Sequence, residues 1–408
     1  AFLFLIWLAQ GIGRRSLRIS PVFITWSLLF FLFLAGVSLF FAEQFSWGLR
    51  KFLYFCSIFP LYFLISDPDS KIDFKKIAKI LTIAGFVVAI LGLAQFGLQF
   101  FVEKSVLIGL WAERIGPIFY GKALGGLVAQ NPSWLVNIGG RTFLRSLAFF
   151  PDPHMLSFYL GMILPFVLVG RKKFNLLAGG AIFACLILTF SRGGYLGVLF
   201  SLLFMLIFVW PRLSGRQKSG IVFLGLAVVA LLFIFAGFVP QLQGPAFGRF
   251  LSIFNLREGS NLGRMKIWQE SLQFWQRAPL FGVGLGNYPA QSNWDLAYWS
   301  PVTSHNLYLD ILTELGIFAL IGWLFLIFGT IFWLAKRIRS SGNGYLLAFL
   351  GSLIYFSVHS FFETAIFNPI ILALLMVVLG LSAREASRPE YQNISRKDIR
   401  LSGHQIKK

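Results

Sequence analysis

The sequence predicts an all-α integral membrane protein with about eleven transmembrane helices. Composition is the first reason: 57% of the 408 residues are hydrophobic and only 13% are charged, whereas soluble domains carry roughly a quarter of charged residues. The second reason is that the apolar residues form blocks of about 18 to 30 residues, the length that a helix needs to cross a hydrocarbon layer. The third is that basic residues gather in every second connection between these blocks.

The apolar blocks define the predicted helices in chain order. The sequence begins at Ala1 inside the first block, so we expect that helix to be truncated and the full-length protein to have twelve. The block that begins at residue 306 is long enough to start outside the bilayer or to tilt within it. The predicted spans are 1–12, 22–41, 49–66, 78–102, 154–169, 174–190, 194–210, 221–239, 306–334, 345–362 and 366–382.

Short connections rich in lysine and arginine identify the cytoplasmic face. Six of them alternate with successive spans and therefore fall on one side of the membrane, which the positive-inside rule makes cytoplasmic. The formal charge of +20 thus indicates membrane lipids as partners, and not nucleic acid. The basic residues are Arg14, Arg15 and Arg18; Lys71, Lys75, Lys76 and Lys79; Arg171, Lys172 and Lys173; Arg212, Arg216 and Lys218; Lys336, Arg337 and Arg339; and those of the tail after Arg384.

Spans and connections divide the chain into four parts. These are an N-terminal helix bundle at 1–239 with an outer loop near 103–153, a large extracytoplasmic loop at 240–305, C-terminal transmembrane helices at 306–382, and a basic cytoplasmic tail at 383–408. Neither long loop shows the period-2 alternation of a sheet. The large loop has apolar residues at spacings of three and four between 261 and 276, which predicts an amphipathic surface helix.

Three polar residues that are far apart in the sequence fall at the same predicted level of the membrane. Arg192 follows Ser191 in a short outer turn, Arg264 lies on the predicted surface helix, and His305 opens the span after the large loop. Each has an ordinary structural explanation as well. A boundary arginine often reaches to lipid headgroups, Arg264 fits a solvated helix face, and His305 fits a helix cap.

Together the three residues match the needs of a lipid-diphosphate substrate. Guanidinium groups bind phosphate oxygens through paired, charge-assisted hydrogen bonds at the level of the headgroups. An imidazole can take the proton from an attacking sugar hydroxyl. The few acids of the outer loops show no metal-ligand spacing, so we expect no metal and no cofactor, with arginine as the charge stabiliser.

Further polar residues near these three are candidates for a supporting role. Asp310 and Glu314 are costly in lipid and either orient the site or pair with an arginine, and His359 and Glu363 form a similar pair on a later helix. Asp67 and Asp69 have the two-acid spacing of metal-dependent transferases but fall on the cytoplasmic side in a predicted turn. The glycine-rich segment 282–286 lacks the βαβ context of a nucleotide loop and is a predicted turn. Supporting candidates are Ser191, Asn306, Asp310, Glu314 and His154, the last with helix capping as its alternative.

Three short motifs resemble the O-antigen ligase and polymerase family of bacterial polytopic membrane proteins. They agree with it in order, spacing and sidedness, and the similar core covers roughly residues 145–335. The motifs are Leu188 to Gly194 (LTFSRGG), Gly263 to Trp268 (GRMKIW) leading to Pro279 to Gly284 (PLFGVG), and Ser304 to Asn306 (SHN) followed by Glu314 to Gly316 (ELG).

The resemblance implies a membrane glycosyltransferase of polysaccharide or lipopolysaccharide biosynthesis. Such an enzyme moves a glycan from undecaprenyl diphosphate to an acceptor, without metal, at the periplasmic face of the bacterial inner membrane. By the same resemblance, Arg192 and Arg264 hold the diphosphate, and His305 activates the acceptor hydroxyl.

The sequence leaves the acceptor and the oligomeric state open. A ligase that uses lipid A core and a polymerase that extends a glycan differ in acceptor and not in these motifs. The alternative of another class is a transporter, for example for inorganic carbon, which needs polar or broken helices near the midplane of the bilayer.

Overall fold

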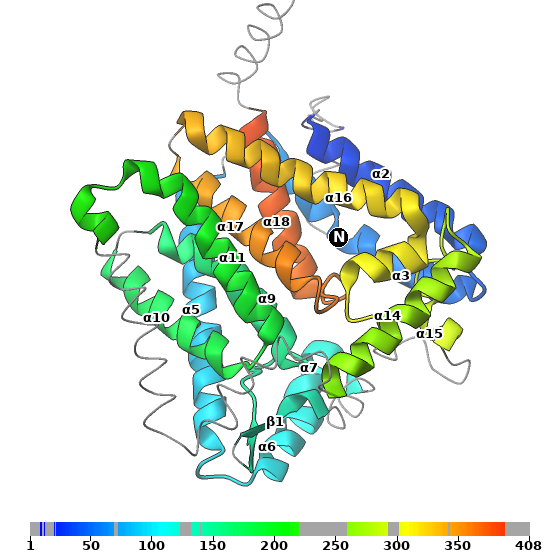
Figure 1. Cartoon of the computed structure of the whole chain (residues 1–408), viewed down its shortest axis with the longest axis horizontal. Coiled ribbons are helices and arrows are strands. Elements are labelled where there is room, and N and C mark those ends of the chain that lie inside the picture. The colour runs from blue at the N-terminus through cyan, green and yellow to red at the C-terminus, as the bar shows by residue number, and fades with distance from the viewer. Residues whose placement is uncertain are drawn as a thin grey trace, which may run out of the picture.

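The computed structural model describes residues 22–68, 72–122, 132–138, 140–170, 172–219, 259–292, 302–341 and 343–387, together with Ala9, Ile12 and Ser20. These residues form a helix bundle with a group of short elements at one end (Figure 1). The helices of the bundle are α2 (Phe23–Val37), α3 (Phe45–Ile58), α4 (Pro60–Ser66), α5 (Phe74–Leu98), α9 (Pro153–Leu168), α10 (Lys173–Leu188), α11 (Arg192–Val209), α16 (Leu307–Ser341), α17 (Gly344–His359) and α18 (Pro369–Ala386).

The shorter elements connect these helices, and several of them cover one end of the bundle (Figure 1). They are the 3-10 turns η1 (Ser38–Phe41), η3 (Pro132–Trp134) and η4 (Trp210–Arg212), the π-helical turn η2 (Trp111–Ile115), the helices α6 (Lys104–Leu110), α7 (Gly116–Tyr120), α14 (Gly259–Arg277) and α15 (Tyr288–Ser292), and the strands β1 (Leu135–Ile138) and β2 (Arg141–Leu144).

Six helical segments of the described chain are long and apolar enough to cross a membrane, and three shorter apolar helices accompany them. These nine segments coincide with the predicted spans that fall in the described residues. The predicted spans 1–12 and 221–239 lie outside those residues, so the total of about eleven stays a prediction. The long segments are Phe23–Phe41, Phe45–Ser66, Phe74–Leu98, Arg192–Arg212, Leu307–Ser340 and Pro369–Ala386, and the shorter ones are α9, α10 and α17.

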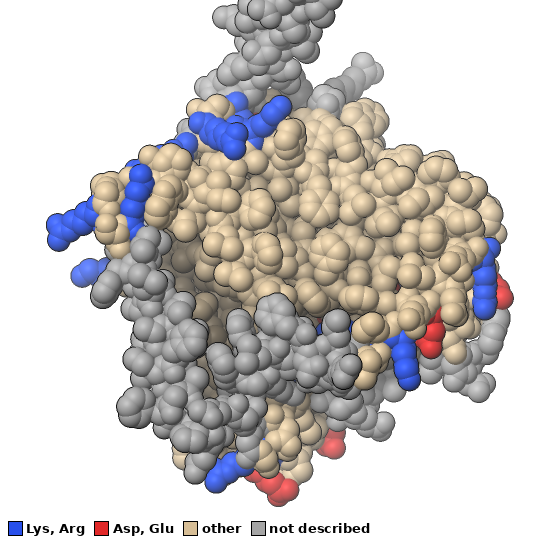
Figure 2. Space-filling model, in the orientation of Figure 1, with Lys and Arg blue, Asp and Glu red and all other residues tan. Residues whose placement is uncertain are grey.

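The surface of the bundle fits a lipid environment. Figure 2 shows a broad face without charged side chains, with lysine and arginine along its upper and left rim and charges of both signs near its lower edge. Large apolar side chains point outward from the helices: Phe33 is 64% exposed and Leu176 is 82% exposed. Soluble proteins rarely expose apolar patches of this extent, and the chain is therefore a helical membrane protein.

A small residue brings the start of α11 against the end of α17. Gly193 lies so close to α17 that an added Cβ would stand 2.8 Å from Cδ2 of His359. Small residues allow helices in membranes to approach in this way. The result is that Ser191, which directly precedes α11, meets the last turn of α17 in the interior of the bundle.

Helix α16 is broken near its start. Gly316 has φ 80° and ψ −177°, a conformation that is essentially restricted to glycine. The break leaves the carbonyls of Thr313 and Glu314 free to accept hydrogen bonds from N–H groups of segment 282–286, at 2.9 and 3.0 Å. All three glycines of this segment have positive φ and form a close-packed turn, which confirms the prediction of a turn.

Gly316→Ala is expected to lower the free energy of unfolding by at least about 2 kcal/mol, from backbone strain and overpacking together. The new Cβ would stand 2.2 Å from the carbonyl oxygen of Leu280. The control is Gly180→Ala in α10, where no atom lies within 4 Å of the added carbon and alanine favours a helix. Thermal unfolding of the purified variants checks this; equal midpoints for both variants would contradict it.

The outer loop near 103–153 contains a β-hairpin, which departs from the predicted all-α fold. Strands β1 and β2 pair antiparallel with Leu135 opposite Leu144. Each strand has four residues, too few for the period-2 pattern to stand out in the sequence. The buried side chains of Trp111, Trp134 and Leu144 form a separate small core there.

A helix within 261–276 is confirmed, and α14 extends it to Gly259–Arg277. The helix packs against α16 through the side that carries the buried residues Ser271 and Phe274. Leu262 and Met265 of the predicted apolar stripe are 45% and 41% exposed. They therefore lie on the side that faces away from the bundle, as a helix at a membrane surface requires; that location itself stays a prediction.

Candidate functional site

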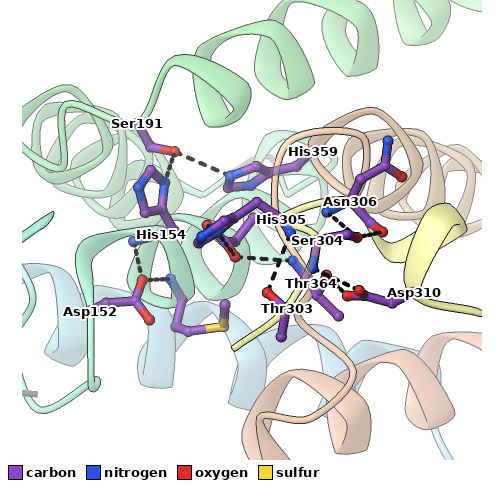
Figure 3. A network of polar contacts seen from close by, with 12 residues as sticks. Asp152, His154, Ser191, Thr303, Ser304, His305, Asn306, Asp310, His359 and Thr364 are labelled. Atoms are coloured by element: carbon purple, nitrogen blue, oxygen red, sulfur yellow. Dashed lines mark hydrogen bonds and ion pairs between the residues drawn. The ribbon is translucent and has the colours of Figure 1, made fainter. Parts of the chain in front are cut away.

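Four segments that are distant in the sequence meet at one end of the bundle (Figures 1 and 3). They are the starts of α9, α11 and α16 and the loop that follows α17. They carry His154, Ser191, His305 and, from the end of α17 and its loop, His359 and Glu363. The sequence has four histidines, and all but His404, which lies outside the described residues, gather here.

His305 and Glu363 form an ion pair across two loops. Nδ1 of His305 lies 3.0 and 3.1 Å from the two carboxylate oxygens of Glu363. The His305 side chain is 39% exposed, whereas that of Glu363 is 10% exposed. Among the described residues, the other ring nitrogen of His305, Nε2, has no hydrogen-bond partner. The imidazole is therefore held at one nitrogen and available at the other.

The pKa shifts of His305 and Glu363 agree with the short distance between the two side chains. The negative charge of Glu363 and the hydrogen bond to it raise the pKa of His305 above its ordinary value, against smaller opposing effects of burial and of the Arg264 charge. Burial acts to raise the pKa of Glu363, yet the positive charge of His305 and its hydrogen bond keep that pKa below its usual range. Each partner thus favours the charged form of the other.

The backbone of His305 is strained into position. Its φ is 52°, in the left-handed region that non-glycine residues seldom adopt. Such strain persists only where surrounding contacts determine the conformation, and it is frequent at functional sites. Here a nearby residue supplies such a contact, because the N–H of Leu307 donates to the carbonyl of Ser360 at 2.9 Å and ties the loop of His305 to the loop of Glu363.

Asp310 joins the same two loops through its side chain. Oδ1 accepts a hydrogen bond from the Ser304 N–H at 2.8 Å, and Oδ2 accepts one from the hydroxyl of Thr364. Ser304 precedes His305 and Thr364 follows Glu363, while Asp310 itself is 2% exposed. Of the two explanations for Asp310, pairing with an arginine or orienting the site, the geometry favours the second.

Asp310→Leu is expected to slow turnover about tenfold or more, because it leaves the buried Ser304 N–H and Thr364 hydroxyl without their acceptor. Asp310→Asn is expected to retain most activity, since its amide oxygen still accepts one bond and the threonine hydroxyl can accept from the amide group. The measurement is turnover of both variants, with unfolding midpoints to check folding. Equal losses in both variants would show that charge and not position matters at this residue.

Ser191 links two of the histidines. Its Oγ lies 3.0 Å from Nδ1 of His154 and 3.1 Å from Nε2 of His359. It also accepts a hydrogen bond from the Gly194 N–H at 3.3 Å and so caps α11. The cap of α9 is the neighbouring Asp152, which accepts from two backbone N–H groups, so the alternative role of His154 as a cap is wrong.

A half-buried acid, Asp152, adds to the charge pattern of this site. Burial first, and the nearby negative charge of Glu363 second, raise the pKa of Asp152 to about 6, while the positive charge of Arg145 acts in the opposite direction.

Arg145 is 6% exposed and donates to the carbonyls of Thr189 and Ser133 at 2.6 and 2.7 Å. It holds the outer loop to the end of α10.

The two predicted arginines lie around these groups. Arg192 is half-buried as the first residue of α11, directly after Ser191. Arg264 is half-buried on α14, one turn before Trp268, whose Nε1 donates to the Ser304 carbonyl at 3.0 Å. Residues four apart share a helix face, which directs Arg264 toward the loop of His305, and its charge contributes to the pKa of both His305 and Glu363.

Two supporting candidates have structural roles instead. Glu314 pairs with a lysine and not with an arginine: both of its oxygens lie 2.9 Å from Nζ of Lys51, and it also accepts from the Gly286 N–H at 3.0 Å. Asn306 caps α16, because its Oδ1 accepts from the N–H groups of Tyr308 and Leu309. Figure 3 shows Asn306 on the far side of Ser304 from His154.

His359 and Glu363, the second pair of polar residues that the sequence marked, both lie at this site but have different partners. Glu363 binds His305, whereas His359 stacks on Phe158 with ring centroids 3.8 Å apart and bonds to Ser191. The sequence marked both residues as polar near the end of a helix, but no signal in it identified their partners. Arg145, Asp152 and Tyr355 are further members of this site that the sequence did not single out.

Among the described residues, no group of three or more histidine, cysteine, aspartate or glutamate side chains is arranged to hold a metal ion. The charged groups near His305 are the carboxylates of Glu363 and Asp310 and the guanidinium of Arg264.

Comparison with known proteins finds a similarity for the central part of the chain. No curated protein matches it. A family model described as O-antigen ligase matches residues 176–324, a range that includes Ser191, Arg192, Arg264 and His305. His154, His359 and Glu363 come from segments outside this range and complete the site. The central region of the chain is therefore similar to the O-antigen ligase family.

Proposed function

We propose that this protein is a membrane glycan transferase that moves an oligosaccharide or polysaccharide from undecaprenyl diphosphate to an acceptor hydroxyl at the outer face of the bacterial inner membrane. The observation that carries the proposal is the His305–Glu363 pair, with an available Nε2 and with Arg264 directed toward the same loop. The match of residues 176–324 to the O-antigen ligase family model supports the same class of function.

Arg192 and Arg264 are assigned to the diphosphate of the donor. Both are half-buried at the end of the bundle that carries the histidines, and we assign this end to the level where a lipid-linked diphosphate lies. Guanidinium groups bind phosphate oxygens in pairs and remain charged at every physiological pH. They stabilise the negative charge that develops on the diphosphate as it leaves.

His305 is assigned to the acceptor. Its Nε2 takes the proton of the acceptor hydroxyl while that oxygen attacks the anomeric carbon of the donor sugar. A new glycosidic bond forms as the bond from this carbon to the diphosphate oxygen breaks, and undecaprenyl diphosphate departs with the electron pair. Glu363 stabilises the imidazolium that results and holds the ring in place.

The break in α16 bears on the transporter alternative. Transporters place broken helices near the midplane of the bilayer. The 25 residues from Ile317 to Ser341 that follow the break are continuous helix and extend about 37 Å, enough to cross a membrane by themselves. The break therefore fits the outer boundary, and we favour the transferase.

The test is reconstitution of the purified protein in liposomes with a labelled undecaprenyl-diphosphate oligosaccharide and candidate acceptors. A single addition to lipid A core indicates a ligase, and a ladder of products indicates a polymerase. We expect full transfer in the presence of EDTA, because arginine supplies the positive charge. Strict dependence on a divalent ion would contradict the metal-free mechanism, and absence of transfer with every acceptor would contradict the proposal.

A further inference from the structure

A chain of hydrogen bonds runs through the interior of the bundle behind the site. It starts at the phenol of Tyr355, passes through the ring of His359 and the hydroxyl of Ser191, and ends at His154. The distances are 3.2 Å from Tyr355 Oη to His359 Nδ1, 3.1 Å from His359 Nε2 to Ser191 Oγ, and 3.0 Å from Ser191 Oγ to His154 Nδ1. Tyr355, His359 and Ser191 are all 0% exposed.

One backbone carbonyl determines the direction of the first bond. The Tyr355 hydroxyl lies 2.6 Å from the carbonyl oxygen of Ser157, and a carbonyl can only accept. The single proton of the phenol is therefore used there, and Tyr355 must accept from Nδ1 of His359. His359 thus carries its proton on Nδ1.

The remaining bonds follow from this tautomer. The ring of His359 packs against Phe158 and Tyr355, and both of its nitrogens bond to hydroxyl groups, so the neutral imidazole is the form that suits its place in the interior. Nε2 of His359 then accepts, and the Ser191 hydroxyl donates to it. With its proton used, Ser191 accepts from the Gly194 N–H and from Nδ1 of His154.

We propose that this chain fixes the tautomer of His154 with the proton on Nδ1, so that its Nε2 is a hydrogen-bond acceptor for a hydroxyl group of the glycan substrate. Nδ1 faces the fully buried Ser191, and His154 as a whole is half-buried. Among the described residues Nε2 has no hydrogen-bond partner, so it is the ring nitrogen left to bind a ligand. The inference deepens the proposed transferase function and rests on it for the identity of the ligand.

Nitrogen NMR of protein that carries isotope-labelled histidine, in lipid nanodiscs, tests the tautomer of His154 without any substrate. Protonated and unprotonated ring nitrogens have well-separated chemical shifts. The His154 signal is assigned by its loss in His154→Gln. We expect Nδ1 protonated and Nε2 unprotonated in the wild type. A His154 signal with protonated Nε2 would overturn the assignment.

Tyr355→Phe tests whether the hydrogen bond at one end of the chain sets the tautomer of His154 at the other end. It removes the acceptor for His359 Nδ1, so we expect His359 and His154 to lose their single tautomers and transfer to fall about tenfold. The matched control is Ser201→Ala, which removes a buried hydroxyl that donates to the Gly351 carbonyl at 2.8 Å, between α11 and α17. An unchanged His154 signal in Tyr355→Phe would overturn the role of the chain.

The acceptor role of His154 is tested with two variants that carry an amide side chain, His154→Asn and His154→Gln. Both are assayed for transfer of a labelled undecaprenyl-diphosphate oligosaccharide. The shorter amide side chain of His154→Asn reaches only to the position of Nδ1, whereas in His154→Gln an amide oxygen can take the place of Nε2. We expect kcat/KM to fall about tenfold or more for His154→Asn, with partial recovery for His154→Gln. Equal values in wild type and His154→Asn would exclude the subsite.

The two kinds of measurement separate the inference from the function on which it rests. If the wild type transfers no glycan, the proposed function fails while the NMR result still decides the tautomer. If the wild type is active and the NMR result is as expected but His154→Asn has full activity, the tautomer stands and the hydroxyl subsite fails.

Discussion

Substitution of His305 by alanine is expected to lower the rate of glycan transfer by about 10²- to 10⁴-fold, the range over which a positioned general base accelerates proton transfer. Binding of the lipid-linked donor should remain, because the arginines that hold the diphosphate are unchanged. Turnover at saturating donor measures the first effect, and retention of labelled donor by the detergent-solubilised protein measures the second.

The pH dependence of Glu363→Gln identifies the base more specifically. His305 must be neutral to take a proton, and Glu363 raises its pKa, so the rate should fall as the pH drops through that raised value. Removal of the carboxylate charge lowers the pKa of His305 and moves this acidic limb to lower pH. The plateau rate should also fall, because the amide neither stabilises the imidazolium nor holds the ring as firmly.

A matched control for Glu363→Gln is Glu43→Gln, which removes an exposed carboxylate that accepts a hydrogen bond from the Gln291 side chain at 2.8 Å. Its pH profile should coincide with that of the wild type. If Glu363→Gln lowers the plateau and leaves the acidic limb in place, a group other than His305 titrates in the reaction. If His305→Ala keeps more than about a tenth of the wild-type rate, general-base catalysis by this residue is excluded.

The helices could be predicted because the bilayer imposes a simple physical rule on the sequence. A segment in lipid must satisfy its backbone hydrogen bonds within itself and present apolar side chains over its whole length. The run of residues 80–94 satisfies that rule, and the structure has a helix over Phe74–Leu98 that contains it. The hairpin at 135–144 follows no such rule, because its four-residue strands depend on packing against Trp111 and Trp134.

The site could be predicted only in part. Arg192, Arg264 and His305 were found because polar groups at a membrane boundary stand out in an apolar sequence, and because short motifs surround them. The partner of His305 could not be found, since Glu363 lies 58 residues further along the chain and only the packing of α16 and α17 brings it near. The same holds for the break at Gly316, which depends on contact with a distant loop.

Replacement of Arg264 is the second change with a large expected effect. If its guanidinium binds the diphosphate, Arg264→Ala should reduce kcat/KM by about 10²-fold, which corresponds to two charge-assisted hydrogen bonds. Arg264→Lys keeps the charge but not the paired geometry, and should recover only part of this loss. The test compares binding of undecaprenyl diphosphate and undecaprenyl monophosphate, and the wild-type preference for the diphosphate should shrink in both variants.

Arg277 on the same helix provides the control. It is exposed at the far end of α14, about 20 Å from Arg264 by helix rise, and its guanidinium lies 5.7 Å from the ring of Phe274. Arg277→Ala removes the same charge from α14 and should leave the preference for diphosphate intact. If both alanine variants weaken binding equally and added salt removes the difference from wild type, α14 attracts the anionic lipid surface as a whole. Arg264 is identified as a ligand of the diphosphate only if Arg264→Ala loses the preference for diphosphate and Arg277→Ala keeps it. Both variants have the same net charge, so a difference between them cannot come from net charge.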